Sequence, residues 1–247
     1  MYYEIEQMQR LIKEQDGAQI YYDPASLPWT KTVESSWKVI RQELDRLLMA
    51  IDLLPGFEEI QVEQEEITSD HRWKIFPLFA HGSWFEKNQS RCPETAKVLR
   101  AIPGLRVGMF SILQAGKEIP PHCGPYSGIL RYHLGLKIPS PNTLCGISVG
   151  EEVAHWEEGA SLLFDDTHMH YAWNRSSEDR VVLFLDITRP LPAGLAAKNE
   201  AVISLIGESE FITAAAEKWE LWEGMYGERL DQHLSALTTA AGGAPLD

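Results

Sequence analysis

The alternation of apolar and polar residues divides this chain into three zones with different periods. Between Arg106 and about Arg189 lie short β-like runs separated by Gly, Pro and Asn, namely "RVGMFSILQAG", "GILRYHLGLKIP", "LCGISVG", "ASLLFDD" and "RVVLFLDITRP". No long helical pattern interrupts these runs. They therefore predict an antiparallel sandwich or barrel.

Helical patterns flank this β zone on both sides. In residues 32–56 apolar side chains recur every three or four positions, and a second helix is expected in residues 91–104, where Pro93 suits the first turn. The chain is helical again after Pro192. We therefore expect a single domain with a mainly helical N-terminal part (1–104), a β core (105–192) and a helical C-terminal part (193–247).

Composition narrows the possible partners. The 247 residues are 44% hydrophobic, which is enough for a sizeable core, and they carry a formal net charge of −14. Nucleic-acid polymers and anionic membranes require clustered Lys and Arg. Three cysteines are too few for a disulfide framework, and the sequence has neither a signal peptide nor a run of about 18 apolar residues. We expect a cytoplasmic protein, monomeric or homodimeric, that binds neither nucleic acid nor a membrane.

Polar side chains occur in the β zone where strand faces should be buried. In residues 129–138 a period of two places Arg131 and His133 on one face and apolar residues on the other. This pattern fits either a sheet with a solvated outer face or a strand that carries polar groups into a site.

Arg180 is a second unusual polar position, because it begins the run "RVVLFLD", which is apolar on both faces. A guanidinium in a buried strand needs an anionic partner to offset its desolvation. A bound carboxylate would suit it, and so would an ion pair with a neighbour such as Asp179 or Asp186.

The stretch "FDDTHMHYAWN", residues 164–174, contains metal-ligand residue types at strand spacing. Asp166, His168 and His170 alternate, so in an extended conformation all three would face one way. Two imidazoles and a carboxylate suit Fe, Zn, Cu or Mn. Histidines one residue apart are common by chance, so His168 could equally be a surface residue.

The order and spacing of these residues resemble a known family. The stretches "FSILQAGKEIPPHCGPYSGILRYHLGL", "WEEGASLLFDDTHMHYAWN" and "DRVVLFLDITRP" are similar to the aspartyl/asparaginyl β-hydroxylases. These are Fe(II)- and 2-oxoglutarate-dependent oxygenases whose relatives include lipid A hydroxylases. The resemblance implies a mainly β fold with flanking helices around a double-stranded β-helix, a jelly-roll core of the cupin type.

The resemblance also assigns roles to individual residues. His122 and His170 would be the metal ligands, and Asp166 would act through metal-bound water. The other assigned residues would bind 2-oxoglutarate, with one carboxylate on Arg131 and His133 and the distal carboxylate on Ser111 and Arg180. Bidentate arginine contacts of this kind are strong and directional.

Gly124 stands where most 2-oxoglutarate oxygenases have a carboxylate ligand, but the aspartyl/asparaginyl hydroxylases resemble this chain in having glycine there. Halogenases of the same cofactor class also have Gly or Ala at this position, which leaves a coordination position for chloride. Gly124 therefore predicts an open position at iron that either water or a halide could fill.

The expected function is hydroxylation of an unactivated C–H bond with O2 and 2-oxoglutarate, giving succinate and CO2. Ile129 replaces an arginine that grips the substrate carboxylate in the animal hydroxylases, so a small molecule, an amino acid or a short peptide is expected as substrate. The candidate pocket residues are Ile129 and the aromatics Trp84, Tyr126, Trp156 and Trp173. Two alternatives stay open: a halogenase acting on a natural-product intermediate, and a non-catalytic cupin-like module that binds a small acid.

Overall fold

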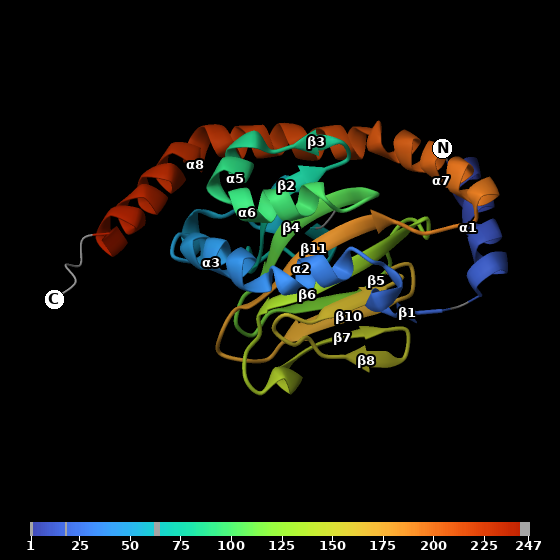
Figure 1. Cartoon of the computed structure of the whole chain (residues 1–247), viewed down its shortest axis with the longest axis horizontal. Helices are drawn as coiled ribbons and strands as arrows, with labels where there is room; N and C mark the ends of the chain where they lie inside the picture. Colours follow the sequence, from blue (N-terminus) through green and yellow to red (C-terminus); the bar gives the residue numbers. More distant parts are fainter. Residues whose placement is uncertain (1, 18, 62–64, 243–247) are drawn as a thin grey trace.

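The computed structural model describes residues 2–17, 19–61 and 65–242 and is built around two antiparallel sheets (Figure 1). One sheet contains the core strands β4 (Leu105–Leu113), β6 (Ile129–Lys137), β9 (Ser161–Phe164) and β11 (Arg180–Thr188) in the order β9-β6-β11-β4. The four-stranded sheet contains β5 (Glu118–His122), β7 (Cys145–Val149), β8 (Glu152–Ala154) and β10 (His170–Asn174) in the order β5-β10-β7-β8. The chain thus passes repeatedly from one sheet to the other, which is the topology of a jelly roll. The mainly β, jelly-roll prediction is confirmed.

The N-terminal part widens the larger sheet to seven strands. β1 (Tyr21–Tyr22) pairs with β9, β2 (Trp73–Ala80) pairs with β4, and β3 (Ser83–Trp84) pairs with β2. The sequence did not predict β2, because "WKIFPLFA" has no alternation: the strand is buried on both faces, and its register shifts between Pro77 and Phe79.

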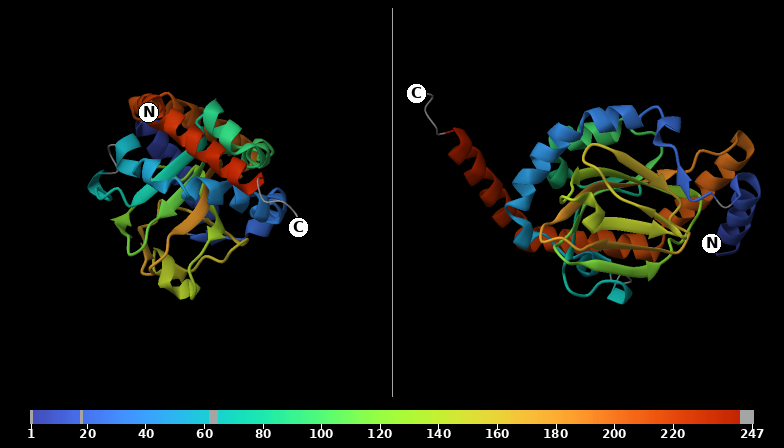
Figure 2. Two further views of the ribbon diagram at one scale, coloured as in Figure 1. Left: turned by 90° about the vertical axis from the view of Figure 1, so that its left-hand side faces the viewer. Right: turned by 90° about the horizontal axis from the view of Figure 1, so that it is seen from below.

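Helices cover the ends and the outer face of this sheet. They are α1 (Tyr2–Asp16), α2 (Thr30–Ser35), α3 (Trp37–Leu48), α4 (Phe57–Ile60), α5 (Glu86–Arg91), α6 (Pro93–Arg100), α7 (Ala193–Gly207) and α8 (Glu210–Gly242), with short 3-10 turns η1 (Pro24–Ser26), η2 (Ile51–Leu53) and η4 (Asn142–Leu144). The helix expected over 32–56 is divided between α2, α3 and η2, whereas α6 begins at Pro93 as predicted. α8 runs along one side of the molecule and projects beyond the sheets at its C-terminal end (Figures 1 and 2). Within the described ranges, no helix has the length and apolar character needed to cross a membrane.

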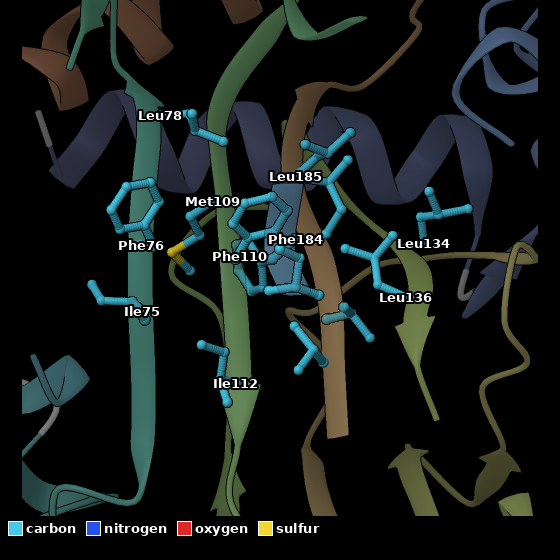
Figure 3. Close-up of a cluster of buried hydrophobic side chains, with 14 of the residues drawn as sticks. Ile75, Phe76, Leu78, Met109, Phe110, Ile112, Leu134, Leu136, Phe184 and Leu185 are labelled. Carbon is cyan, nitrogen blue, oxygen red and sulfur yellow. The ribbon is translucent and has the colours of Figure 1, made fainter. Parts of the chain in front are cut away.

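The main core lies between the larger sheet and these helices (Figure 3). Phe76 of β2 pairs across the sheet with Phe110 of β4, and this row of apolar side chains continues to Leu183 of β11 and Leu134 of β6. Trp219 of α8 meets the ring of Phe76 edge-on at 6.1 Å. The side chains of neighbouring strand positions point the other way, toward the smaller sheet, and build the candidate site.

A second, separate apolar cluster joins α1 to α7. Met8 and Ile12 of α1 pack there with Val202 and Ile203 of α7, and Tyr126 belongs to the same cluster. The loop between β5 and β6 is therefore held against this pair of helices.

Candidate active site

Two predicted metal ligands lie side by side between the sheets. His122 ends β5 and His170 begins β10, and the two residues are direct partners in the antiparallel ladder, with ring centroids 4.1 Å apart. Each Nδ1 lies 2.9 Å from a backbone carbonyl, of Pro120 and His168 respectively. Donation from Nδ1 fixes the tautomer in which Nε2 keeps its lone pair, as metal ligation requires.

The surroundings keep both imidazoles neutral. Burial lowers the pKa of His122, and burial together with the nearby His122 and Arg131 lowers the pKa of His170 to about 3. Metal ions bind the neutral ring, so these histidines suit a cation site.

The stretch before His170 is a turn, so Asp166, His168 and His170 do not share one strand face. The carboxylate of Asp165 accepts hydrogen bonds from the backbone N and the hydroxyl of Thr167, at 3.0 and 2.6 Å, and thereby folds the chain back. Across the described part of the chain, no group of three or more His, Cys, Asp or Glu side chains is placed to hold a metal ion. The possible triad of two histidines and a carboxylate is not formed.

Asp166 instead lies beside Gly124. A Cβ built on Gly124 would clash with the Asp166 carboxylate, and the Gly124 amide donates to the Asp166 carbonyl at 2.7 Å. The space that a side chain at position 124 would occupy is thus filled by the Asp166 carboxylate from the neighbouring loop.

Arg131 is held by two carboxylates. It faces Asp166 at 2.8 Å through Nη1, and Asp186, its direct cross-strand partner on β11, at 3.0 Å through Nε and 3.2 Å through Nη2. Burial alone would lower the pKa of Arg131, but the two acids outweigh it and the pKa is raised. Asp186, considered above as a partner for Arg180, therefore pairs with Arg131. The sequence could not place it, because the partners are joined only by strand register.

Arg180 and His133 differ from Arg131, because buried nitrogens of both side chains lack a hydrogen-bond partner within the described residues. Arg180 is 2% exposed, its guanidinium lies 4.5 Å from the Trp156 ring, and neither Nε nor Nη1 has a hydrogen-bond partner among the described residues. Burial lowers its pKa to about 10. Both ring nitrogens of His133 are also buried without a partner in the described structure, and burial lowers its pKa well below the usual range. Buried polar groups without partners are rare and suit a bound anion.

One small cavity between the two sheets joins these groups. Seven of the predicted site residues line it, namely Ser111, His122, Arg131, His133, Trp156, His170 and Arg180, together with Trp73, Ile119, Ile147, Phe164, Ala172 and Phe184. The sequence did not identify Trp73, whose indole Nε1 donates to Ser111 Oγ at 3.0 Å. No local signal marks it, because it lies on the unpredicted strand β2.

The candidate pocket residues are dispersed. Trp156 lines the cavity, whereas Trp173 faces away from it because the neighbouring Ala172 takes the inward position on β10. Trp84 lies on the edge strand β3, 4.1 Å from the guanidinium of Arg100.

The last two candidate pocket residues belong to the α1–α7 cluster. Tyr126 is buried there and donates to Asn199 Oδ1 at 2.6 Å, and Ile129 packs against the same cluster. The fold and the cavity together define a jelly-roll protein in which a pair of histidines and a buried arginine line one cavity between the sheets.

Comparison with known proteins agrees with this class. A family model described as aspartyl/asparaginyl β-hydroxylase matches residues 34–190. A Rhizobium tropici protein named ornithine lipid ester-linked acyl 2-hydroxylase is 41% identical over 202 residues, which cover 82% of this chain and 72% of that protein. The mouse aspartyl/asparaginyl β-hydroxylase is 34% identical over 184 residues, covering 70% of this chain but only 24% of the mouse enzyme. The chain belongs to the aspartyl/asparaginyl β-hydroxylase family, and these relatives are hydroxylases.

Solved structures give weaker likenesses. The TT1209 protein from Thermus thermophilus matches with a TM-score of 0.33 and 15% identity, covering 51% of this chain and 94% of that one. A cupin domain of a transcriptional regulator from Enterobacter cloacae matches with a TM-score of 0.33 and 13% identity, covering 48% of this chain and 99% of that one. These scores are too low to support an argument about function.

Proposed function

We propose that this protein is a non-haem iron hydroxylase that uses 2-oxoglutarate as cosubstrate. The observation that carries the proposal is the shared cavity, in which two histidines lie near a buried guanidinium and a buried imidazole whose nitrogens lack hydrogen-bond partners among the described residues, namely Nε and Nη1 of Arg180 and both ring nitrogens of His133. A dicarboxylate chelated to a metal would satisfy both kinds of group. Family membership supports the hydroxylase activity.

Each residue has a defined task in this proposal. His122 and His170 would hold iron through Nε2, while Arg180 and Ser111 would bind the distal carboxylate of 2-oxoglutarate. Arg131 and His133 would receive its other end. Arg131 donates hydrogen bonds from Nε and Nη2 to Asp186 and forms an ion pair with Asp166 through Nη1, so Nη2 keeps a second N–H for a ligand.

The remaining walls serve to exclude water. Trp156, Phe164 and Phe184 line the cavity and are 1%, 0% and 6% exposed, so charged groups inside interact in a dry, preorganised environment. With O2, bound iron and 2-oxoglutarate would supply the oxidising chemistry for an unactivated C–H bond, releasing succinate and CO2.

The substrate class follows best from the Rhizobium tropici relative, whose name specifies an ester-linked acyl group of a lipid. Ile129 is two residues before Arg131 on the same strand face, and it packs among apolar residues. An apolar residue here offers no positive charge for a substrate carboxylate. We therefore favour an acyl chain over the amino acid or peptide considered from the sequence.

The two alternatives have less support. Chloride would need the space beside Gly124, and the Asp166 carboxylate fills that space with negative charge. A non-catalytic binding module would not require the paired histidines to be held with both Nε2 atoms available.

An activity assay tests the proposal. The protein is incubated with Fe(II), ascorbate, 2-oxoglutarate and O2, with and without chloride, and offered an ester-linked acyl aminolipid in micelles, free amino acids or short peptides. We expect succinate release and a gain of one oxygen atom on the lipid, both lost in His170→Ala. A chlorinated product would favour the halogenase. No succinate from any combination, despite metal and 2-oxoglutarate binding, would contradict the proposal.

A further inference from the structure

A buried arginine just beyond β11 connects segments that flank both histidines. Arg189 is 2% exposed. Its Nε donates to the Ser127 carbonyl at 2.5 Å, its Nη2 forms an ion pair with Asp165 Oδ2, and its Nη1 donates to the hydroxyl of Tyr22. The Arg189 amide also donates to the Gly128 carbonyl at 3.0 Å.

The partners of Arg189 belong to two loops that border the metal site. Ser127 and Gly128 lie in the loop that follows His122 and leads into β6, whereas Asp165 begins the turn that leads to His170. One side chain therefore joins the segment after the first histidine to the segment before the second.

Asp165 transmits this restraint along its own turn. While Oδ2 pairs with Arg189, Oδ1 accepts from the backbone and hydroxyl of Thr167, and the Asp165 amide donates to Ile20 at 2.9 Å. The next residue, Asp166, lies against Gly124 of the first loop and pairs with Arg131. The position of Asp166 thus depends on the anchoring of its neighbour.

We propose that Arg189 is a positioning residue that fixes the spacing of the two histidine-bearing segments and the placement of Asp166. The inference rests on the proposed iron site. Without Arg189, the buried Asp165 carboxylate has no ion-pair partner among the described residues and turns toward solvent, because an uncompensated buried charge is unfavourable. The turn before His170 then shifts relative to the loop after His122. Mutation of a residue that orients metal ligands in this way typically lowers metal affinity by about 10- to 100-fold.

The test compares Arg189→Met with Arg91→Met. Arg91 is also buried, at 8% exposure, and also bound by carboxylates, because its guanidinium contacts Glu223 and Asp231 at 2.6 and 2.8 Å. Its contacts join α5 to α8 and include no residue that lines the cavity. Both substitutions break a buried ion pair, but only the first affects the histidine-bearing loops.

Mn(II) affinity is measured calorimetrically for the full-length protein, well below the unfolding temperature of each variant. We expect Arg189→Met to weaken Mn(II) binding by about 10- to 100-fold and Arg91→Met to leave it within about twofold, although both variants melt earlier. If Arg189→Met does not fold, Arg189→Lys is used instead. Lysine keeps the positive charge but lacks the planar arrangement of N–H donors of the guanidinium, so it should weaken Mn(II) binding less than the roughly 10- to 100-fold expected for methionine.

The outcomes separate this inference from the proposed function. If the wild type binds Mn(II) and the Arg189 variants bind it equally well, or if Arg91→Met weakens it as much, the positioning role is refuted while the metal site stands. If the wild type itself binds no Mn(II) or Fe(II), the proposed function fails and the inference fails with it.

Discussion

Replacing Arg180 with methionine should separate two effects of this residue, namely the free-energy cost of burying its charge on folding and its contribution to 2-oxoglutarate binding. Burial lowers the pKa of Arg180 from its ordinary value to about 10, which corresponds to about 3 kcal/mol against the charged form in the folded state. Because the folded-state pKa is lowered, this penalty is complete at neutral pH and declines only as the pH rises above about 10. The contact with the Trp156 ring, at 4.5 Å, offsets about 1 kcal/mol of it.

Arg180→Met should therefore stabilise the ligand-free protein by about 1–2 kcal/mol, or about 2–8 °C in Tm. The same change should weaken 2-oxoglutarate binding at least about thirtyfold, because it removes one partner of a buried charge pair. Urea unfolding with and without 2-oxoglutarate, together with calorimetric titration in the presence of Mn(II), measures both effects.

Arg91→Met is the matched control. Arg91 has carboxylate partners that raise its pKa above its ordinary value, so its loss should destabilise the protein by about 3–5 kcal/mol. The reasoning is refuted if Arg180→Met destabilises the protein as Arg91→Met does, or if it keeps wild-type affinity for 2-oxoglutarate.

Three further substitutions test other contacts of the site. Gly124→Ala should displace Asp166 and lower metal affinity about 10- to 100-fold, measured by Mn(II) titration. His170→Ala should weaken Mn(II) binding by more than about a hundredfold, since it removes a ligand outright; retained binding would place the metal elsewhere. Asp186→Asn should loosen Arg131 and weaken 2-oxoglutarate binding by about tenfold with little change in metal affinity, because a charge-assisted hydrogen bond contributes about 1.5–3 kcal/mol.

A glycine elsewhere controls for the Gly124 substitution. A Cβ on Gly224 of α8 meets nothing within 4 Å, so Gly224→Ala should leave Mn(II) binding unchanged and stabilise the helix by about 1 kcal/mol. If Gly124→Ala also left metal binding and turnover unchanged, the close fit between Gly124 and Asp166 would have no role in the site.

The five β-like runs predicted from the sequence correspond to β4, β6, β7, β9 and β11, whereas β5, β8 and β10 were not among them. Arg131 and His133, which alternate with the buried Leu130, Tyr132 and Leu134, do share the face that lines the cavity. Arg180 at the start of an apolar run indicated a buried cation that needs an anion, and no local acid supplies it among the described residues. These are properties of single strands and need no knowledge of the fold.

The features that the sequence did not predict depend on contacts between distant segments. Pairing of Arg131 with Asp186 requires the register of β6 on β11, and contact of Asp166 with Gly124 requires two loops to meet. The turn before His170 did have a local signal, because an Asp two residues before a Thr favours the side-chain-capped turn seen at Asp165.

Anaerobic titration with Fe(II) and 2-oxoglutarate tests the central claim most directly. A visible metal-to-ligand charge-transfer band that saturates at one equivalent of each component is predicted for the wild type. It should disappear in His170→Ala, and in Arg180→Met it should need far more 2-oxoglutarate. No band in the wild type, or an unchanged band in His170→Ala, would contradict the assignment of this cavity as an iron and 2-oxoglutarate site.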